Sequence, residues 1–290
     1  MDTPRRITVL DTTLRDGEQA PGASMTPTEK LALAHVIASV GVDVIEAGFA
    51  FSSRGEAEAL RMIAAEVEGP VICSLARARL SDIDAAAHAL REAPRRRVNV
   101  FISTSDIHLA HQLRITRAEA LRRAVDAVMY ARTMFSDVEF CAMDATRSDR
   151  VYLAEVFHAC IEAGATTLNI ADTVGYAVPE EFGGLVQAMK QGVPGMDRVT
   201  TSVHCHNDLG LALANTLAGI ATGATQVECT LTGEGERAGN CSLQALARVL
   251  RQRTDHYHVR LGVMVLADPA LHWACAESAK ACASRTLVSA

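Results

Sequence analysis

Short β-rich runs and helix-like runs alternate along this chain of 290 residues, and their alternation predicts the fold class. Eight such pairs fill about 250 residues, with turn-like residues between them. That number of units and that length indicate an α/β protein, an eight-stranded parallel (β/α)8 TIM barrel. A doubly wound open sheet is the alternative, but such a sheet does not need eight evenly spaced units.

The expected elements follow in order along the chain. The strands are expected at residues 7–10, 42–47, 70–75, 98–103, 138–141, 166–170, 199–204 and 225–231. The helices are expected at residues 26–39, 55–67, 81–92, 116–134, 150–163, 179–191, 209–222 and 241–252. The first helix has the clearest boundary signals: Thr26 is a suitable N-cap, Pro27 fits the first helical position and Glu29 lies in the first turn.

The sequence shows no domain break before Thr254. We therefore expect one catalytic barrel over residues 1–253 and a helical tail over residues 254–290. The tail includes an alanine-rich run at 270–284 that could cover the barrel or begin an interface helix.

Composition is typical of a globular protein, with 49% hydrophobic and 21% charged residues and a net charge of −6. The only basic run, at residues 95–97, is interpreted as a solvated loop, so neither a nucleic acid nor an anionic membrane is an expected partner. Eight scattered cysteines without a Cys-x-x-Cys pair predict reduced thiols. Without a signal-peptide pattern at its start, the chain is expected to be cytoplasmic.

Two histidines close the seventh expected strand. Side chains two positions apart on a strand point the same way, so His204 and His206 can project together from its end. Two imidazoles without a thiolate pair suit a divalent ion that also takes oxygen ligands. Asn207 or Asp208 would cap the helix that follows. The alternative is one buried and one exposed histidine without a metal.

Polar residues gather where the other expected strands end. They include Asp11 to Gln19, Glu46, Arg77, His108, Asp144, Asp172, Thr173 and the segment from Gly233 to Asn240. Active sites of such barrels lie at this end of the strands, and the density of charge there favours the metal interpretation. Two imidazoles and one carboxylate leave coordination positions open for a substrate. Arg15 could place a cation near a developing oxyanion, and the glycines at 233, 235 and 239 permit close approach of a ligand.

Three motifs together resemble a known family. They are Leu10-Asp11-Thr12-Thr13-Leu14-Arg15-Asp16-Gly17-Glu18-Gln19, the segment from Ser202 to Leu211, and Gly235-Glu236-Arg237-Ala238-Gly239-Asn240. In this order they resemble the metal-dependent aldolase-type barrels that include 2-isopropylmalate synthase, homocitrate synthase and hydroxymethylglutaryl-CoA lyase. The resemblance covers residues 6 to 252 and is greatest to 2-isopropylmalate synthase.

The resemblance implies a Claisen-type condensation of acetyl-CoA with a 2-oxo acid, expected to be 3-methyl-2-oxobutanoate, and release of CoA in leucine biosynthesis. It implies a divalent metal, Mn²⁺, Zn²⁺ or Mg²⁺, and a homodimer. The implied metal ligands are Asp16, His204 and His206, with Asn240 at or near the ion; the implied catalytic residues are Arg15, Glu46 and Thr173; the implied substrate-binding residues are His108, Thr173, Gly233 and Gly235.

Three departures from the family pattern concern the binding of the 2-oxo acid and the end of the chain. Met143 stands where the synthases usually have a glutamate, and Asp106 and Gln112 stand where proline and lysine are common. The chain is also expected to lack the lid and regulatory domain of full-length synthases. These departures leave open a homocitrate or other alkylmalate synthase and a non-catalytic barrel that binds a metal or an acyl-CoA.

A lyase that cleaves a hydroxyacyl-CoA is the remaining alternative. The lyases carry a reactive cysteine in the glycine-rich loop, whereas residues 233–236 contain none and Cys241 lies beyond Asn240.

Overall fold

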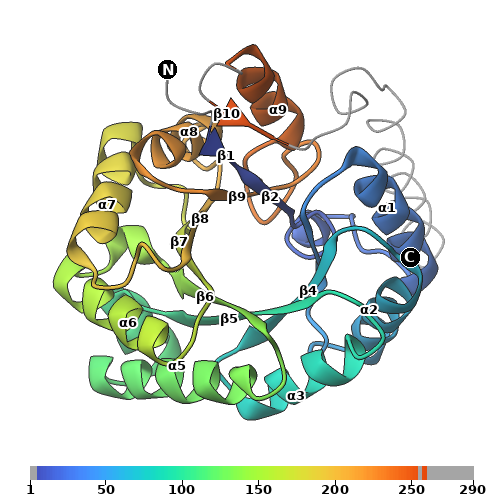
Figure 1. Cartoon of the computed structure of the whole chain (residues 1–290), viewed down its shortest axis with the longest axis horizontal. Coiled ribbons are helices and arrows are strands. Elements are labelled where there is room, and N and C mark those ends of the chain that lie inside the picture. Colours follow the sequence, from blue (N-terminus) through green and yellow to red (C-terminus); the bar gives the residue numbers. More distant parts are fainter. Residues whose placement is uncertain (1–4, 254–256, 260–290) are drawn as a thin grey trace.

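Eight parallel strands form a closed barrel surrounded by helices (Figure 1). The computed structural model describes residues 5–253 and 257–259. The barrel strands follow one another in chain order: β2 (Thr8–Asp11), β3 (Val44–Gly48), β4 (Val71–Arg77), β5 (Arg96–Ser103), β6 (Asp137–Met143), β7 (Thr167–Asp172), β8 (Thr200–Cys205) and β9 (Gln226–Cys229). The predicted fold class is confirmed, and the doubly wound open sheet is excluded.

Helices connect the strands on the outside of the barrel. They are α1 (Pro27–Val40), α2 (Arg54–Glu66), α3 (Leu80–Ala89), α5 (Arg117–Arg132), α6 (Arg150–Glu162), α7 (Pro179–Gly192), α8 (Ala212–Thr222) and α9 (Leu243–Gln252). Short helical turns follow several strands: η1 (Gly17–Gln19), α4 (Asp106–His108), η2 (Leu109–Leu113) and η3 (Ala145–Arg147). Because all the pairings are parallel, the carboxyl ends of the strands and these turns lie at one mouth of the barrel.

Closure depends on the pairing of the first barrel strand with the last. Leu10 of β2 lies opposite Val44 of β3 on one side and opposite Glu228 of β9 on the other. The loop after β2 therefore lies beside the loops after β8 and β9, although about 190 or more residues separate them in the sequence.

The start of α1 confirms the predicted boundary. The Thr26 side chain accepts from the Glu29 N–H, and the Glu29 side chain accepts from the Thr26 N–H, which is a complete capping box. Gly41 follows the helix with φ of 89°, a conformation that favours glycine.

Two sequence-based expectations were wrong. The arginine run at 95–97 is not a solvated loop, because Arg97 lies in β5 and is buried against Asp137 and Glu139. The helix expected from residue 209 begins at Ala212, with Leu211 as its N-cap residue, since the chain first makes a turn around Gly210. The Asn207 side chain still accepts from the Ala212 N–H, at 3.2 Å.

The predicted tail at 254–290 lies outside the described residues except for 257–259. Within that short segment, β10 (Tyr257–His258) pairs with β1 (Arg5–Arg6) in a small separate sheet. The boundary between barrel and tail therefore stays a prediction.

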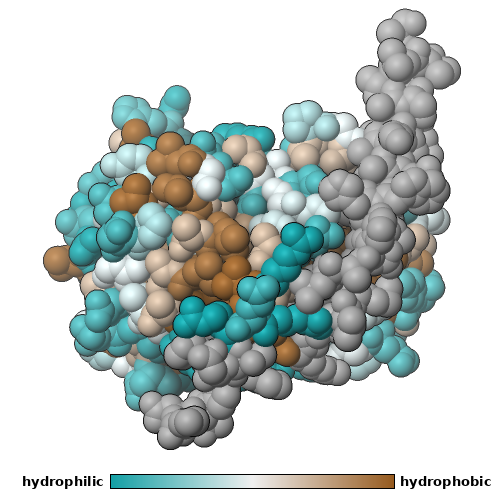
Figure 2. All heavy atoms as spheres, turned by 90° about the horizontal axis from the view of Figure 1, so that it is seen from above, coloured by the Kyte–Doolittle hydropathy of each residue, from teal (hydrophilic) through white to brown (hydrophobic). Residues whose placement is uncertain are grey.

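The outer surface has the polar character expected of helices that bury their apolar side against the strands. Hydrophilic residues cover much of the described face in Figure 2, and hydrophobic residues gather in one area of it. No helix in residues 5–253 or 257–259 is long and apolar enough to cross a membrane.

Replacing Phe157 by alanine is expected to destabilise the barrel strongly. Phe157 of α6 is buried and meets Phe140 of β6 edge to face, with ring centroids 6.4 Å apart. Removing such a ring costs about 3–5 kcal/mol. The control is Val151→Ala on the same helix, where an 80% exposed side chain should change the free energy of unfolding by less than about 0.5 kcal/mol. Urea unfolding measures both, and equal losses would contradict this packing.

Candidate metal centre

His204 and His206 lie together at the end of β8, as predicted. Their Nε2 atoms are 3.2 Å apart and their ring centroids are 4.9 Å apart. Both side chains are buried, with exposed fractions of 5% and 4%. The alternative of one buried and one exposed histidine is therefore excluded.

Asp16 approaches the two imidazoles from the loop after β2. The Thr12 carbonyl accepts from the backbone N–H groups of Asp16 and Gly17 at 2.8 and 3.2 Å, which makes this loop a tight turn. Asp16 Oδ2 lies 3.7 Å from His204 Nε2 and 3.8 Å from His206 Nε2. Ligand atoms about 2.1 Å from one ion lie about 3–3.5 Å from each other, so these three atoms fit a divalent ion after small adjustments.

The loop between Gly233 and Asn240 holds the other oxygen of Asp16. Asp16 Oδ1 accepts from Asn240 Nδ2 at 3.0 Å and from the Glu236 N–H at 3.1 Å. A Cβ at Gly235 would lie 2.1 Å from Asn240 Nδ2, so no side chain fits there. Asn240 Oδ1 is buried without a hydrogen-bond partner in the described part of the chain, which leaves it available as a further oxygen ligand.

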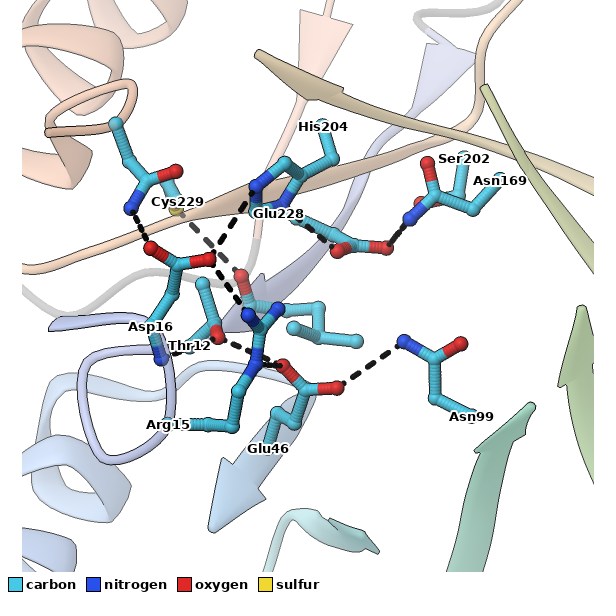
Figure 3. Close-up of polar contacts among 12 residues, drawn as sticks. Thr12, Arg15, Asp16, Glu46, Asn99, Asn169, Ser202, His204, Glu228 and Cys229 are labelled. Carbon is cyan, nitrogen blue, oxygen red and sulfur yellow. Dashed lines mark hydrogen bonds and ion pairs between the residues drawn. The ribbon is translucent and has the colours of Figure 1, made fainter. Parts of the chain in front are cut away.

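Arg15 joins the centre to a second carboxylate, Glu46 (Figure 3). Its Nη1 lies 2.6 Å from Asp16 Oδ2, and its Nε donates to Glu46 Oε2 at 2.7 Å. Glu46 is fully buried and also accepts from Thr12 Oγ1 at 2.7 Å and from Asn99 Nδ2 at 3.1 Å. Glu46 therefore holds the Arg15 guanidinium in place through this ion pair.

The electrostatics of the centre keep Asp16 charged and the imidazoles neutral. Burial alone would raise the pKa of Asp16, but the charge of Arg15, and in acid also that of the two protonated histidines, lowers this pKa below its usual range. Burial also disfavours charge on Arg15, but Glu46 and Asp16 outweigh this and raise its pKa. Burial lowers the pKa of His204. Burial and the neighbouring His204 lower the pKa of His206 to about 4. A carboxylate and two uncharged imidazoles are the ionisation states that bind a metal.

A pocket of about 300 Å³ opens onto these groups. Its polar lining residues are Arg15, Asp16, Gln19, Asn99, Thr173, His204, His206, Glu228 and Glu236. Its apolar lining residues, called the apolar wall, are Phe49, Leu75, Phe101, Cys141, Met143 and Ala171, and Gln112 completes the lining. The pocket therefore suits a ligand that carries both oxygen atoms and a hydrocarbon group.

The remaining predicted residues lie at different distances from the pocket. Thr173 lines it, and its hydroxyl accepts from the Asp144 N–H at 2.8 Å. Glu46 and His108 are not among its lining residues: His108 contacts Ser103 Oγ at 3.1 Å and Arg147 Nη2 at 3.2 Å. Gly233, with φ of 101°, shapes the loop, and its carbonyl accepts from the Asn240 N–H at 2.8 Å.

Several residues of the site were not predicted from the sequence. Glu228 contacts His204, and Asn99 contacts Glu46. Their signal is a polar side chain within a buried strand, which indicates a partner inside the barrel but not which partner. The apolar wall gave no signal, because Phe49, Leu75 and Phe101 resemble core residues.

Comparison with known proteins agrees with this geometry. A family model described as HMGL-like matches residues 6–268. The chain belongs to the HMGL-like family. Among the members it resembles are proteins named 2-isopropylmalate synthase from Gloeobacter violaceus, 56% identical over 260 residues, and from Pyrococcus furiosus, 53% identical over 259 residues.

These matches cover 89% of this chain but 48% and 52% of the two relatives. The chain thus spans about half the length of the curated relatives it matches. The resemblance to this family that the motifs indicated is confirmed.

Solved structures of the same fold include lyases. An HMG-CoA lyase from Pseudomonas aeruginosa is 21% identical, with a TM-score of 0.80 over 98% of this chain and 100% of that one. An HMG-CoA lyase from Acinetobacter baumannii, solved with coenzyme A and 3-methylmalate, is 19% identical, with a TM-score of 0.74 over 94% of this chain and 88% of that one. At these identities the likeness shows the fold alone.

Removal of one candidate ligand is expected to weaken metal binding. Asp16→Asn and His206→Ala should each lower Mn²⁺ affinity by more than about tenfold, since even an outer partner of a ligand contributes that much. The control is His158→Ala, whose exposed ring contacts the Pro194 carbonyl far from the centre. Calorimetric titration of the metal-free proteins measures the affinities. Wild-type affinity in both site variants would contradict the ligand assignment.

Asp11, at the end of β2, is expected to make stability pH-dependent. Burial raises its pKa to about 7, although Thr13 donates to it through both its N–H and its hydroxyl. The folded state therefore holds this proton more tightly than the unfolded state, and the resulting stability is lost as pH rises from about 4 through 7.

Asp11→Asn should remove this dependence. Between pH 5 and 8 the variant should lose about 2–3 kcal/mol less unfolding free energy than the wild type. Urea unfolding across this range, on metal-free protein, tests the expectation, and two parallel pH profiles would contradict it.

Proposed function

We propose that the chain carries the condensing activity of an alkylmalate synthase. It joins acetyl-CoA to a 2-oxo acid, 3-methyl-2-oxobutanoate in the first instance, and releases CoA. The observation that carries the proposal is the centre of Asp16, His204 and His206 with Arg15 beside it, in a chain 56% identical to a protein named 2-isopropylmalate synthase.

The reaction can be written in two balanced steps. A methyl proton of acetyl-CoA is removed, the resulting carbon bonds to the ketone carbon of the acceptor, and the ketone oxygen takes up a proton. Water then cleaves the thioester, which gives a carboxylate and free CoA. A divalent ion, when bound, supplies positive charge that polarises the acceptor ketone.

The residues of the mouth have separate roles in this proposal. Asp16, His204 and His206 hold the ion, with Asn240 beside Asp16. Arg15 is held by Glu46 so that its guanidinium faces the oxygen on which negative charge develops. Thr173 is proposed to bind the acceptor carboxylate, and the loop containing Gly233 and Gly235 to lie against the acyl-CoA. His108, which contacts Arg147, would contribute to substrate binding at the rim of the barrel mouth.

The apolar wall supports an acceptor with a hydrocarbon side chain. Leu75, Phe101 and Met143 line the same pocket as the charged groups. Met143 adds apolar surface where the family resemblance leads one to expect a carboxylate. A branched aliphatic group matches this wall better than a second carboxylate does.

Further features of the proposal follow from the chemistry of the site and the family. Two imidazoles with a carboxylate accept Mn²⁺, Zn²⁺ or Mg²⁺. With 3-methyl-2-oxobutanoate the reaction would belong to leucine biosynthesis, in a cytoplasmic homodimer.

The direct test is CoA release from acetyl-CoA, with Mn²⁺ or Mg²⁺, across a panel of 2-oxo acids. The control omits the oxo acid, and the signal of the eight protein thiols is subtracted. Release that needs both the metal and one oxo acid would support the proposal and name the acceptor. No release with any oxo acid, despite bound metal, would contradict it, and metal-dependent cleavage of a hydroxyacyl-CoA would assign a lyase instead.

Arg15→Ala is expected to separate metal binding from catalysis. The variant should keep its metal but lose about 10²-fold or more in turnover, as enzymes do on loss of one oxyanion-stabilising group. Arg117→Ala is the control, because Arg117 makes exposed ion pairs with Asp106 and Asp149. An unchanged rate for Arg15→Ala would remove Arg15 from the mechanism.

A further inference from the structure

Glu228 connects the candidate metal centre to a row of buried polar side chains inside the barrel (Figure 3). It lies in β9 and is 1% exposed. Its Oε2 lies 3.0 Å from His204 Nδ1, and its Oε1 accepts from Ser202 Oγ at 3.0 Å and from Asn169 Nδ2. Both oxygens are therefore occupied by neighbours, and none of the roles proposed above uses this residue.

The row runs from Glu228 to a guanidinium at the other end of the barrel. Gln226 Nε2 donates to Ser202 Oγ at 3.0 Å, and Gln226 Oε1 accepts from Arg97 Nη1 at 2.8 Å. Arg97 Nη1 also donates to Glu139 Oε2, at 2.9 Å. Arg97, Gln226 and Ser202 are all buried, so water does not compete for these hydrogen bonds.

The direction of each hydrogen bond in the row follows from Arg97. A guanidinium can only donate, so the Gln226 oxygen must face Arg97 and the Gln226 nitrogen must face Ser202. Ser202 Oγ accepts that bond, which leaves its own proton for Glu228. As a carboxylate, Glu228 then receives hydrogen bonds on Oε1 and has Oε2 left to accept from His204.

The two histidines differ in the partners of their Nδ1 atoms. His204 Nδ1 has an acceptor in Glu228, whereas His206 Nδ1 is buried without a partner in the described residues. A proton on His204 Nδ1 leaves the lone pair on Nε2, the atom that faces Asp16 and His206. The opposite tautomer would place a proton on Nε2 and block it as a ligand.

We propose that Glu228 is a positioning residue that holds His204 in the Nδ1–H tautomer, with the sense of its hydrogen bonds fixed by Arg97 through Gln226 and Ser202. The inference rests on the metal centre of the proposed function but not on the condensation reaction. Glu228 acts through its contact with His204.

Glu228→Gln is the sharpest variant, because it keeps the shape of the side chain. His204 donates to Oε2 of Glu228, and Ser202 and Asn169 donate to Oε1, so a glutamine nitrogen at either position meets at least one donor. If the nitrogen faces His204, the ring must reverse its tautomer; if it faces Ser202 and Asn169, the hydrogen bonds that both donate are lost. We expect Mn²⁺ affinity to fall by about 10- to 100-fold, the usual loss when the outer partner of a histidine ligand is changed.

A second variant separates this role from general damage to the core. In Glu228→Gln with Asn169→Asp, the glutamine nitrogen can donate to the new aspartate and to Ser202 Oγ, while its oxygen accepts from His204. This pair should recover most of the lost affinity. Asp82→Asn is the matched control, since it also converts a fully buried carboxylate to an amide, but on α3 beside Arg77, and it should leave Mn²⁺ affinity within about twofold of wild type.

Two readouts on the whole chain, without substrate, test the proposal. Calorimetry gives the Mn²⁺ affinity, and ¹⁵N NMR of the metal-free protein gives the protonated nitrogen of His204, identified by comparison with His204→Ala. Nδ1 protonation in the wild type, loss of affinity in Glu228→Gln and recovery in the pair support the inference. Nε2 protonation in the wild type, or wild-type affinity in Glu228→Gln, would overturn it, and so would failure of the pair to recover. Absence of synthase turnover changes none of these results.

Discussion

The parallel pairing of β2 with β9 is the constraint on which the metal centre depends. It closes the barrel and brings the turn after β2 beside the loops that follow β8 and β9. Asp16 comes from the first of these loops, and His204 and His206 come from the end of β8 and the residue just after it. A sheet left open between β2 and β9 would keep the carboxylate and the imidazoles apart.

Charge pairing inside the closed barrel then determines what each group can do. Asp16 is shared between Arg15 on one side and the two imidazoles on the other, and the loop ending at Asn240 holds its second oxygen. Buried charges are stable only when partners satisfy them. Glu46 beside Arg15 and Glu228 beside His204 provide such partners, so the same contacts that make the interior stable also orient the groups that face the pocket.

The sequence predicted the fold and most of the centre because both depend on local patterns. Strand–helix alternation predicted the barrel, and the spacing of His204 and His206 predicted their common direction. Arg97 was misplaced, because three consecutive arginines resemble a solvated loop unless Glu139 on the next strand is known to face them. Glu228 and the apolar wall were missed for a similar reason: their roles depend on partners that only closure of the barrel brings together.

Asp16, His204 and His206 are proposed to bind one divalent ion between them. Anomalous X-ray diffraction from crystals of the chain grown with Mn²⁺, recorded on both sides of the manganese absorption edge, tests this most directly. A single strong anomalous peak is expected within about 2.0–2.4 Å of Asp16 Oδ2 and of Nε2 of both histidines. A fully loaded protein without a peak there, or with its peak elsewhere, would show that these three residues are not the ligands.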